Sequence, residues 1–158
     1  MNYAKAQKDV LTRLMKVPDA VAHCIFPDGR VGFIVDAVLG FVFPEDTNWI
    51  DCDKLLASVG LASLHLPSGS ASEVLLPTEN LIDRDGVIAR EFHKQGAIGE
   101  CKRVFVQEKW LKNFDSPTLY QNVDKPRGII SITEVSQLEG EQLVGFVMPY
   151  RFKENRKT

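Results

Sequence analysis

Short apolar runs separated by turn residues constrain the fold of this chain more than any other feature. The runs are rich in valine, isoleucine, leucine and phenylalanine, and such segments between glycine and proline signals are typical of strands. The turns carry Asp-Gly, Glu-Gly or Pro and Gly combinations, which bend the backbone within a few residues. They fall at 27–30, 83–86, 125–128 and 139–140. The pattern predicts an antiparallel sheet with strands at 20–26, 31–36, 37–43, 73–77, 86–93, 118–123, 128–135 and 142–152.

Two segments have the spacing of amphipathic helices. In residues 2–17 apolar side chains recur every three or four positions and lysines gather on the opposite side. Pro18 ends this helix, because the residue before a proline avoids helical backbone angles. A shorter helix includes residues 108–114 and ends before Pro117. A third, weaker pattern predicts a helix at 47–59.

Length and composition fit one folded domain. The chain has 158 residues, of which 44% are apolar and 25% charged, a balance typical of a globular protein with its own core. We predict a single α+β domain over residues 1–152, with an antiparallel sheet and two or three helices on one face. Residues 44–102 are a candidate insertion, the small polar residues at 67–72 predict a mobile loop, and 153–158 form a polar tail.

Charge and cysteine content restrict the setting of the protein. A net charge of -2 excludes a uniformly basic surface, so any nucleic-acid contact needs a local patch. The three cysteines are odd in number and lack a paired spacing, which favours a reducing compartment. No apolar stretch of signal-peptide or membrane-spanning length is present, since the longest one, 31–43, contains Asp36. We expect a cytoplasmic protein without membrane contact.

Candidate catalytic and metal-binding residues give weak patterns. No spacing places two metal ligands on one face, and Gly96 with Gly99 lacks the lysine that ends a phosphate-binding loop, so we predict no metal and no cofactor. An enzyme would most simply use Cys101 activated by His93. The plainer interpretation is a loop cysteine and a histidine at a strand end. We therefore predict no catalytic residue.

The lysines support a more specific hypothesis. Lys5, Lys8 and Lys16 share one arc of the first helix, and Lys109 and Lys112 share the polar arc of the later one. If the two helices lie side by side on the sheet, these lysines form one positive face that contacts phosphates without reading bases. The alternative is that they are ordinary solvated helix faces, diluted by nearby acidic residues.

Two features coincide at the ends of the chain. Each end reads as a helix followed by hairpin strands, and the last strand closes with Met148-Pro149-Tyr150-Arg151-Phe152. Together they resemble one module of the DNA sliding clamps, the ring-forming processivity factors of replication, whose bacterial members finish in a similar Met-Pro-x-Arg-apolar run. Residues 104–114 are also similar to the strand-then-helix opening of a clamp half-module. The resemblance covers residues 1–43 loosely and residues 104–158 better.

The resemblance implies a fold and a set of partners. The fold would be a pair of βαβββ-like halves with helices facing DNA. Met148, Pro149 and Arg151 would help to line a pocket for short apolar peptides of replication proteins. A bacterial clamp chain has three modules, whereas this chain has room for one plus the poorly matching residues 44–102. Encircling DNA would therefore require a homo-oligomer.

We expect a non-enzymatic, DNA-associated or replication-accessory binding module of phage or mobile-element type, resembling a single sliding-clamp domain. The rival hypothesis is a protein-interaction or inhibitor module without nucleic-acid contact, for which Trp49 and Trp110 are candidate anchors. An enzyme that uses His93 and Cys101 is the third hypothesis.

Overall fold

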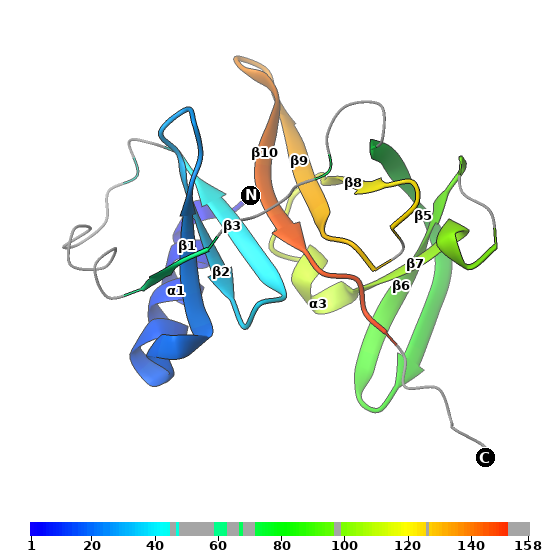
Figure 1. Ribbon diagram of the computed structural model, residues 1–158, viewed down its shortest axis with the longest axis horizontal. Coiled ribbons are helices and arrows are strands. Elements are labelled where there is room, and N and C mark those ends of the chain that lie inside the picture. Colours follow the sequence, from blue (N-terminus) through cyan, green and yellow to red (C-terminus); the bar gives the residue numbers. More distant parts are fainter. Residues whose placement is uncertain are drawn as a thin grey trace.

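One large sheet organises the structure. The structure is a computed structural model that describes residues 1–44, 47, 59–62, 67, 72–96, 99–125 and 127–151. Ten strands of the described chain form this sheet in the order β4-β1-β2-β3-β10-β9-β8-β5-β6-β7, with two α-helices, α1 and α3, beside it (Figure 1). Neighbouring strands are antiparallel except β4, which pairs parallel to β1. The fold is therefore α+β and rich in strand. The strands are β1 (Val21–Ile25), β2 (Val31–Val35), β3 (Leu39–Phe43), β4 (Gly60–Leu61), β5 (Ser72–Arg84), β6 (Val87–Lys94), β7 (Arg103–Gln107), β8 (Thr118–Asn122), β9 (Ile130–Ser136) and β10 (Gly140–Val147).

The first helix, α1 (Tyr3–Lys16), has both ends defined by local chemistry. The Asn2 side chain accepts a hydrogen bond from the Lys5 backbone N–H at 3.0 Å, which caps the first turn. Pro18 begins the short 3-10 helix η1 (Pro18–Ala20) and stops α1. The bounds differ from the predicted 2–17 by one residue at each end.

Two helix-and-meander units meet in the middle of the sheet. α1 precedes the meander β1-β2-β3, and α3 (Glu108–Leu111) precedes the meander β8-β9-β10. The units join through the antiparallel β3–β10 pair, in which Phe41 faces Gly145 and Gly40 faces Phe146. In Figure 1 the blue-to-cyan and yellow-to-red parts of the ribbon lie next to each other. The opening and closing parts of the chain are thus neighbours in space.

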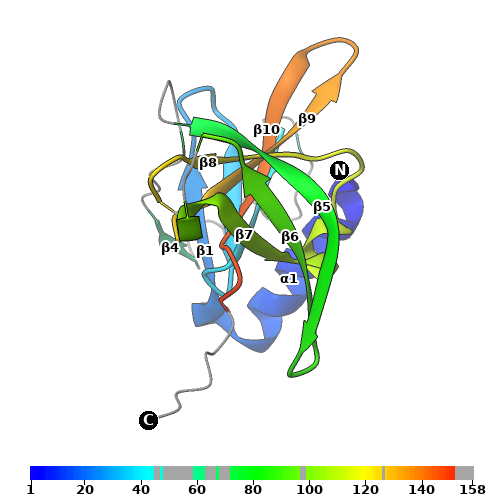
Figure 2. The ribbon, with the colours of Figure 1, turned by 90° about the vertical axis from the view of Figure 1, so that its right-hand side faces the viewer.

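The remaining strands extend the second unit and curl back towards it. β5 pairs with β8 on one side and with β6 on the other, and its register with β6 shifts between Pro77 and Leu81. β7 pairs with β6 and forms the edge of the sheet. The sheet is strongly curved in this region (Figure 2). The backbone N–H of Tyr150 donates to the carbonyl of Phe105 on β7 at 2.7 Å. The segment after β10 therefore connects the middle of the sheet with its far edge.

Two hydrophobic clusters lie on the two sides of the sheet. Phe41 belongs to the larger cluster and the next residue, Val42, to the smaller one, as expected because successive residues of a strand face opposite ways. Val10 of α1 is buried in the larger cluster, and Trp110 and Leu111 of α3 pack against it. Both helices therefore contact the same core.

Several predicted elements differ from the observed ones. The last strand ends at Val147 instead of 152, because Pro149 has no N–H for a sheet ladder. β5 continues to Arg84 rather than ending at 77. β5 and β6 fall within the candidate insertion, yet both pair inside the single sheet. Apart from positions 47, 59, 67 and 72, the predicted helix at 47–59, the loop at 67–72 and the tail at 153–158 lie outside the described residues.

Within the described residues, no helix is long and apolar enough to span a membrane.

Candidate nucleic-acid interface

The start of α1 lies against the end of α3. Lys5 Nζ donates to Asn113 Oδ1 at 2.7 Å, although the two residues are 108 positions apart, and it also contacts Asp9 Oδ2 at 3.0 Å. Asn113 lies two residues after the end of α3 (Glu108–Leu111) and is buried. Its amide in turn donates to the carbonyl of Trp110 at 3.0 Å. The sheet therefore brings the two predicted lysine-bearing segments together.

All five predicted DNA-contacting lysines are exposed. Lys5, Lys8 and Lys16 lie on α1, Lys109 lies on α3, and Lys112 is the residue that caps the C-terminus of α3. Lys109 Nζ stands 5.8 Å from the centre of the Trp110 ring, a cation–π geometry. We call these five lysines the two-helix surface.

Of the paired acidic residues around the two-helix surface, one binds a lysine of this surface and two bind other cations. Asp9 pairs with Lys5, Glu108 accepts from Arg90 Nε at 2.5 Å, and Asp115 accepts from the Met1 amine at 2.8 Å. Within the described part of the chain, no carboxylate lies within salt-bridge distance of the remaining four lysines of this surface. The neighbouring Asp19 is exposed and likewise has no ion pair there. The two-helix surface thus carries a local positive charge on a chain whose net charge is -2.

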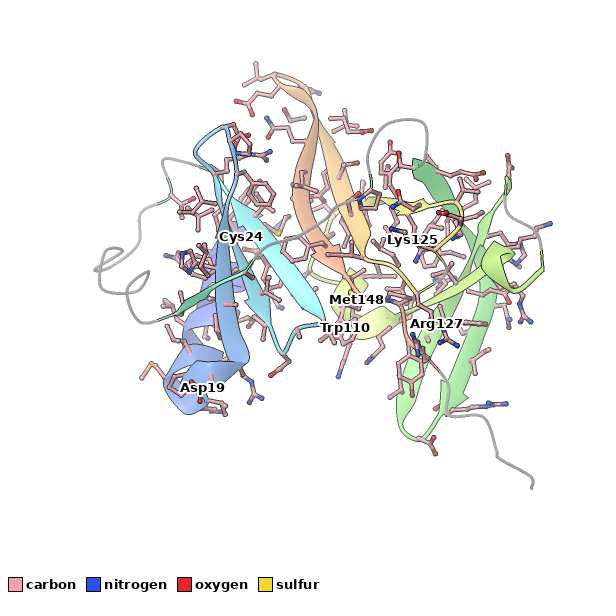
Figure 3. The ribbon with its side chains drawn as sticks, in the orientation of Figure 1. Asp19, Cys24, Trp110, Lys125, Arg127 and Met148 are labelled. Atoms are coloured by element: carbon pink, nitrogen blue, oxygen red, sulfur yellow. The ribbon has the colours of Figure 1, made fainter. Side chains whose placement is uncertain are left out.

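The two predicted aromatic anchors have different outcomes. Trp110, labelled in Figure 3, is only partly exposed because its ring packs against the larger core cluster. Most of its apolar area is therefore already used inside the fold. Trp49 lies outside the described residues.

The closing Met-Pro-x-Arg segment is attached to two separate strands. The Met148 N–H donates to the carbonyl of Val38 at 2.8 Å, and the Tyr150 N–H bonds to β7 as described above. Met148 and Pro149 are half-buried, and Arg151 is exposed. These bonds hold the segment against the sheet.

His93, one residue of the enzyme hypothesis, lies against a carboxylate. His93 Nε2 lies 2.9 Å from Glu91 Oε2, and Arg103 Nε donates to Glu91 Oε1 at 2.6 Å. Burial works to raise the pKa of Glu91, but the hydrogen bonds from Arg103 and His93 outweigh it and leave this pKa below its usual value. The backbone of Cys101 lies in the 3-10 helix η3 (Gly99–Lys102), and its side chain lies outside the described part. Among described side chains, no group of three or more His, Cys, Asp or Glu could hold a metal ion.

An apolar cavity next to α3 was not anticipated from the sequence. It measures about 360 Å³ and lies between α3 and strands β5, β6 and β8, with Arg90 and Lys112 among the charged residues at its border. Its apolar lining comes from segments far apart in the chain, so no local pattern predicts it. The residues are Leu75, Pro77, Phe92, Leu111, Phe114, Pro117 and Leu119.

Comparisons with protein-family models, curated proteins and solved structures found no match to this chain.

Proposed function

We propose that this protein is a non-enzymatic, DNA-associated or replication-accessory binding module that contacts the phosphate backbone through the two-helix surface. The observation that carries the proposal is the Lys5–Asn113 contact at 2.7 Å, which places α1 against the end of α3. The four other lysines of this surface have no carboxylate partner among the described residues. Cations of this kind are free to neutralise phosphates.

The expected DNA contact is electrostatic and independent of sequence. Lysine side chains at helix surfaces bind phosphate oxygens as point charges, whereas base discrimination needs groups that enter a groove. α3 has only four residues, so it is too short to fill a groove as a recognition helix. Affinity in the range of roughly 10⁻⁴–10⁻⁶ M is typical of such non-specific binding.

The arrangement of the two units supports the sliding-clamp resemblance. Each unit is a helix followed by a three-stranded meander, the units pair through β3 and β10, and both helices contact one core cluster. We propose on this basis that the fold is a pair of clamp-like halves with helices on one face. Met148, Pro149 and Arg151 are proposed to bind apolar peptides, and the setting is proposed to be the cytoplasm, with a phage or mobile element as source.

The test is DNA binding measured against salt concentration. If four lysines neutralise phosphates, the logarithm of the DNA-binding constant falls with the logarithm of the salt concentration at a slope of about -3 to -4. The double variant Lys8→Glu/Lys112→Glu removes most of this binding, since it replaces two attractive charges with repulsive ones. Fluorescence anisotropy with a short duplex gives both quantities.

A matched control uses lysines outside the two-helix surface. Lys102→Glu/Lys125→Glu changes the net charge by the same amount at exposed positions on η3 and after β8. We expect it to keep more of the DNA affinity than the Lys8/Lys112 variant. No detectable binding at low salt, or equal losses in the two variants, contradicts the proposal.

The second candidate function is the protein-interaction or inhibitor module without nucleic-acid contact. It is favoured by the 360 Å³ apolar cavity beside α3, because apolar pockets with a polar border are typical of binding sites. Absent DNA binding together with an intact fold would make this second function the better explanation.

A further inference from the structure

The apolar cavity beside α3, here called the α3 pocket, has the features of a docking site for one apolar side chain. Three residues of its lining are each less than 5% exposed and are packed into the core: Leu75, Phe92 and Leu119. Its volume of about 360 Å³ is larger than a leucine side chain requires. The proposed DNA contact uses Lys112 at the border of this pocket but not its apolar lining.

The same chain presents an apolar tip that the fold leaves uncovered. Leu138 is 97% exposed in the turn between β9 and β10, and Val135 nearby is 74% exposed. Single exposed apolar residues are ordinary, but this one stands at the end of a projecting hairpin (Figures 1 and 2). We call residues 135–141 the 138 tip.

The 138 tip is held in one shape. Its turn is closed by the Ser136–Gly140 strand pair, and the Glu139 N–H donates to Ser136 Oγ at 2.9 Å. Gly140 has φ of +72°, the left-handed conformation that three-residue hairpin turns use. A preorganised tip loses little conformational entropy when it binds.

Charge is complementary between the 138 tip and the α3 pocket. Glu139 and Glu141 accept hydrogen bonds from the uncharged Gln142 and Tyr120, and no cation pairs with either within the described residues. At the pocket border Glu108 is paired with Arg90 and Asp115 with the Met1 amine. Lys112 is thus the border cation without a carboxylate among the described residues, opposite in sign to the tip.

We propose that the 138 tip of one copy inserts Leu138 into the α3 pocket of a second copy, with Glu139 or Glu141 facing Lys112. The tip does not reach the pocket of its own chain, because the β9–β10 ladder keeps it extended and both views place it away from α3. The contact joins two different surfaces, so it repeats head to tail. One inserted residue and its acidic neighbours form a small interface of the weak, reversible class. The proposal stands independently of DNA binding.

The test is sedimentation equilibrium of the full chain without DNA, up to a concentration of about 1 mM, which suits weak association. We expect the average mass to rise with concentration. Leu138→Asp weakens the self-association by roughly 30-fold or more, as expected for a central anchor residue. Met15→Asp, at an 85% exposed position on α1, leaves it unchanged.

A charge exchange tests the orientation of the contact. Lys112→Glu and Glu139→Lys each weaken the self-association, and the double variant restores part of it, because the attractive pair is re-formed with reversed signs. A protein that stays monomeric throughout the series overturns the proposal. So does an association that Leu138→Asp and Met15→Asp change equally. Lys112 belongs to both sites, but since DNA is absent, these outcomes do not depend on whether the two-helix surface binds DNA.

Discussion

At the scale of single residues, Gly40 and Gly145 allow the two helix-and-meander units to approach each other. A Cβ at position 40 would lie 1.9 Å from Cε2 of Phe146, whose ring is 2% exposed and has no room to move away. A Cβ at position 145 would lie 2.6 Å from the carbonyl oxygen of Gly40. Space, not an unusual backbone angle, is what glycine provides at both positions.

Replacing Gly40 with alanine should therefore destabilise the β3–β10 pair. We expect Gly40→Ala to lower the free energy of unfolding by about 1–3 kcal/mol, the usual cost of overpacking a filled core. Adding Phe146→Leu should recover part of this loss, because the smaller side chain relieves the same clash. Urea unfolding of the single and double variants measures both effects.

The control is Gly60→Ala, at an exposed position where an added Cβ meets no atom within 4 Å. Its effect should stay within about 0.5 kcal/mol. Equal stability of the Gly40 variant and this control would show that the packing between β3 and β10 tolerates a methyl group.

At the scale of elements, a charged cluster on one side of the sheet ties β6 to β7. Glu91 and His93 lie on β6, and Arg103 lies on β7, opposite His93 in the strand register. Glu91 is 7% exposed and binds both partners through its carboxylate. Arg103 also stacks 5.5 Å over the ring of Phe105. A buried carboxylate held by Arg103 and His93 makes this strand pair sensitive to acid.

The pH dependence follows from the lowered pKa of Glu91. The unfolded chain binds a proton at the Glu91 carboxyl more readily than the folded chain does. The ionised Glu91 therefore contributes fully to stability above the ordinary pKa of 4.5, and this contribution is lost as the pH falls through the pKa of the folded state. We expect Glu91→Gln to lower the stability at about pH 7 and to flatten the acid limb of the stability profile. Urea midpoints over a pH series measure this difference.

Glu79→Gln serves as the control, since Glu79 is exposed on β5 and has no ion pair within the described residues. Its profile should follow that of the unchanged protein. A Glu91→Gln profile parallel to the native one at every pH would contradict the assigned role of the cluster.

At the scale of the whole molecule, the closing segment connects strands that the sheet order places five positions apart. β10 is the fifth strand and β7 the tenth, yet Tyr150 just after β10 donates its backbone N–H to Phe105 on β7 at 2.7 Å. This bond covers part of the outer edge of β7. Exposed strand edges favour association with other strands, so the bond also protects that edge.

Tyr150→Pro tests this closure because proline has no N–H to donate. We expect a loss of about 1 kcal/mol in the free energy of unfolding, the usual net value of one hydrogen bond. Tyr150→Ala removes the side chain and keeps the N–H, so the difference between the two variants isolates the bond. Equal stability of the two would mean that the bond contributes nothing measurable.

Much of the local structure could be predicted from nearby residues. The helix at α1 follows from its apolar spacing and from Pro18, and the hairpin of β1 and β2 follows from the turn at 27–30. The polar half of β5 lacks an alternating pattern, so its full length was missed. Helical spacing predicts the lysines of the two-helix surface. It does not predict which neighbouring carboxylates are already paired, because Glu108 pairs with Arg90, which comes from the distant strand β6.

The sequence by itself determined where this chain bends and where its first helix begins and ends, because turn chemistry, capping and periodicity act between residues a few positions apart. The tertiary structure alone decided that β3 pairs with β10, that Lys5 meets Asn113, and that Leu75, Phe92 and Leu119 enclose a pocket. These contacts join residues up to 108 positions apart. Their energy depends on complementary packing of surfaces that form only when the whole sheet has assembled.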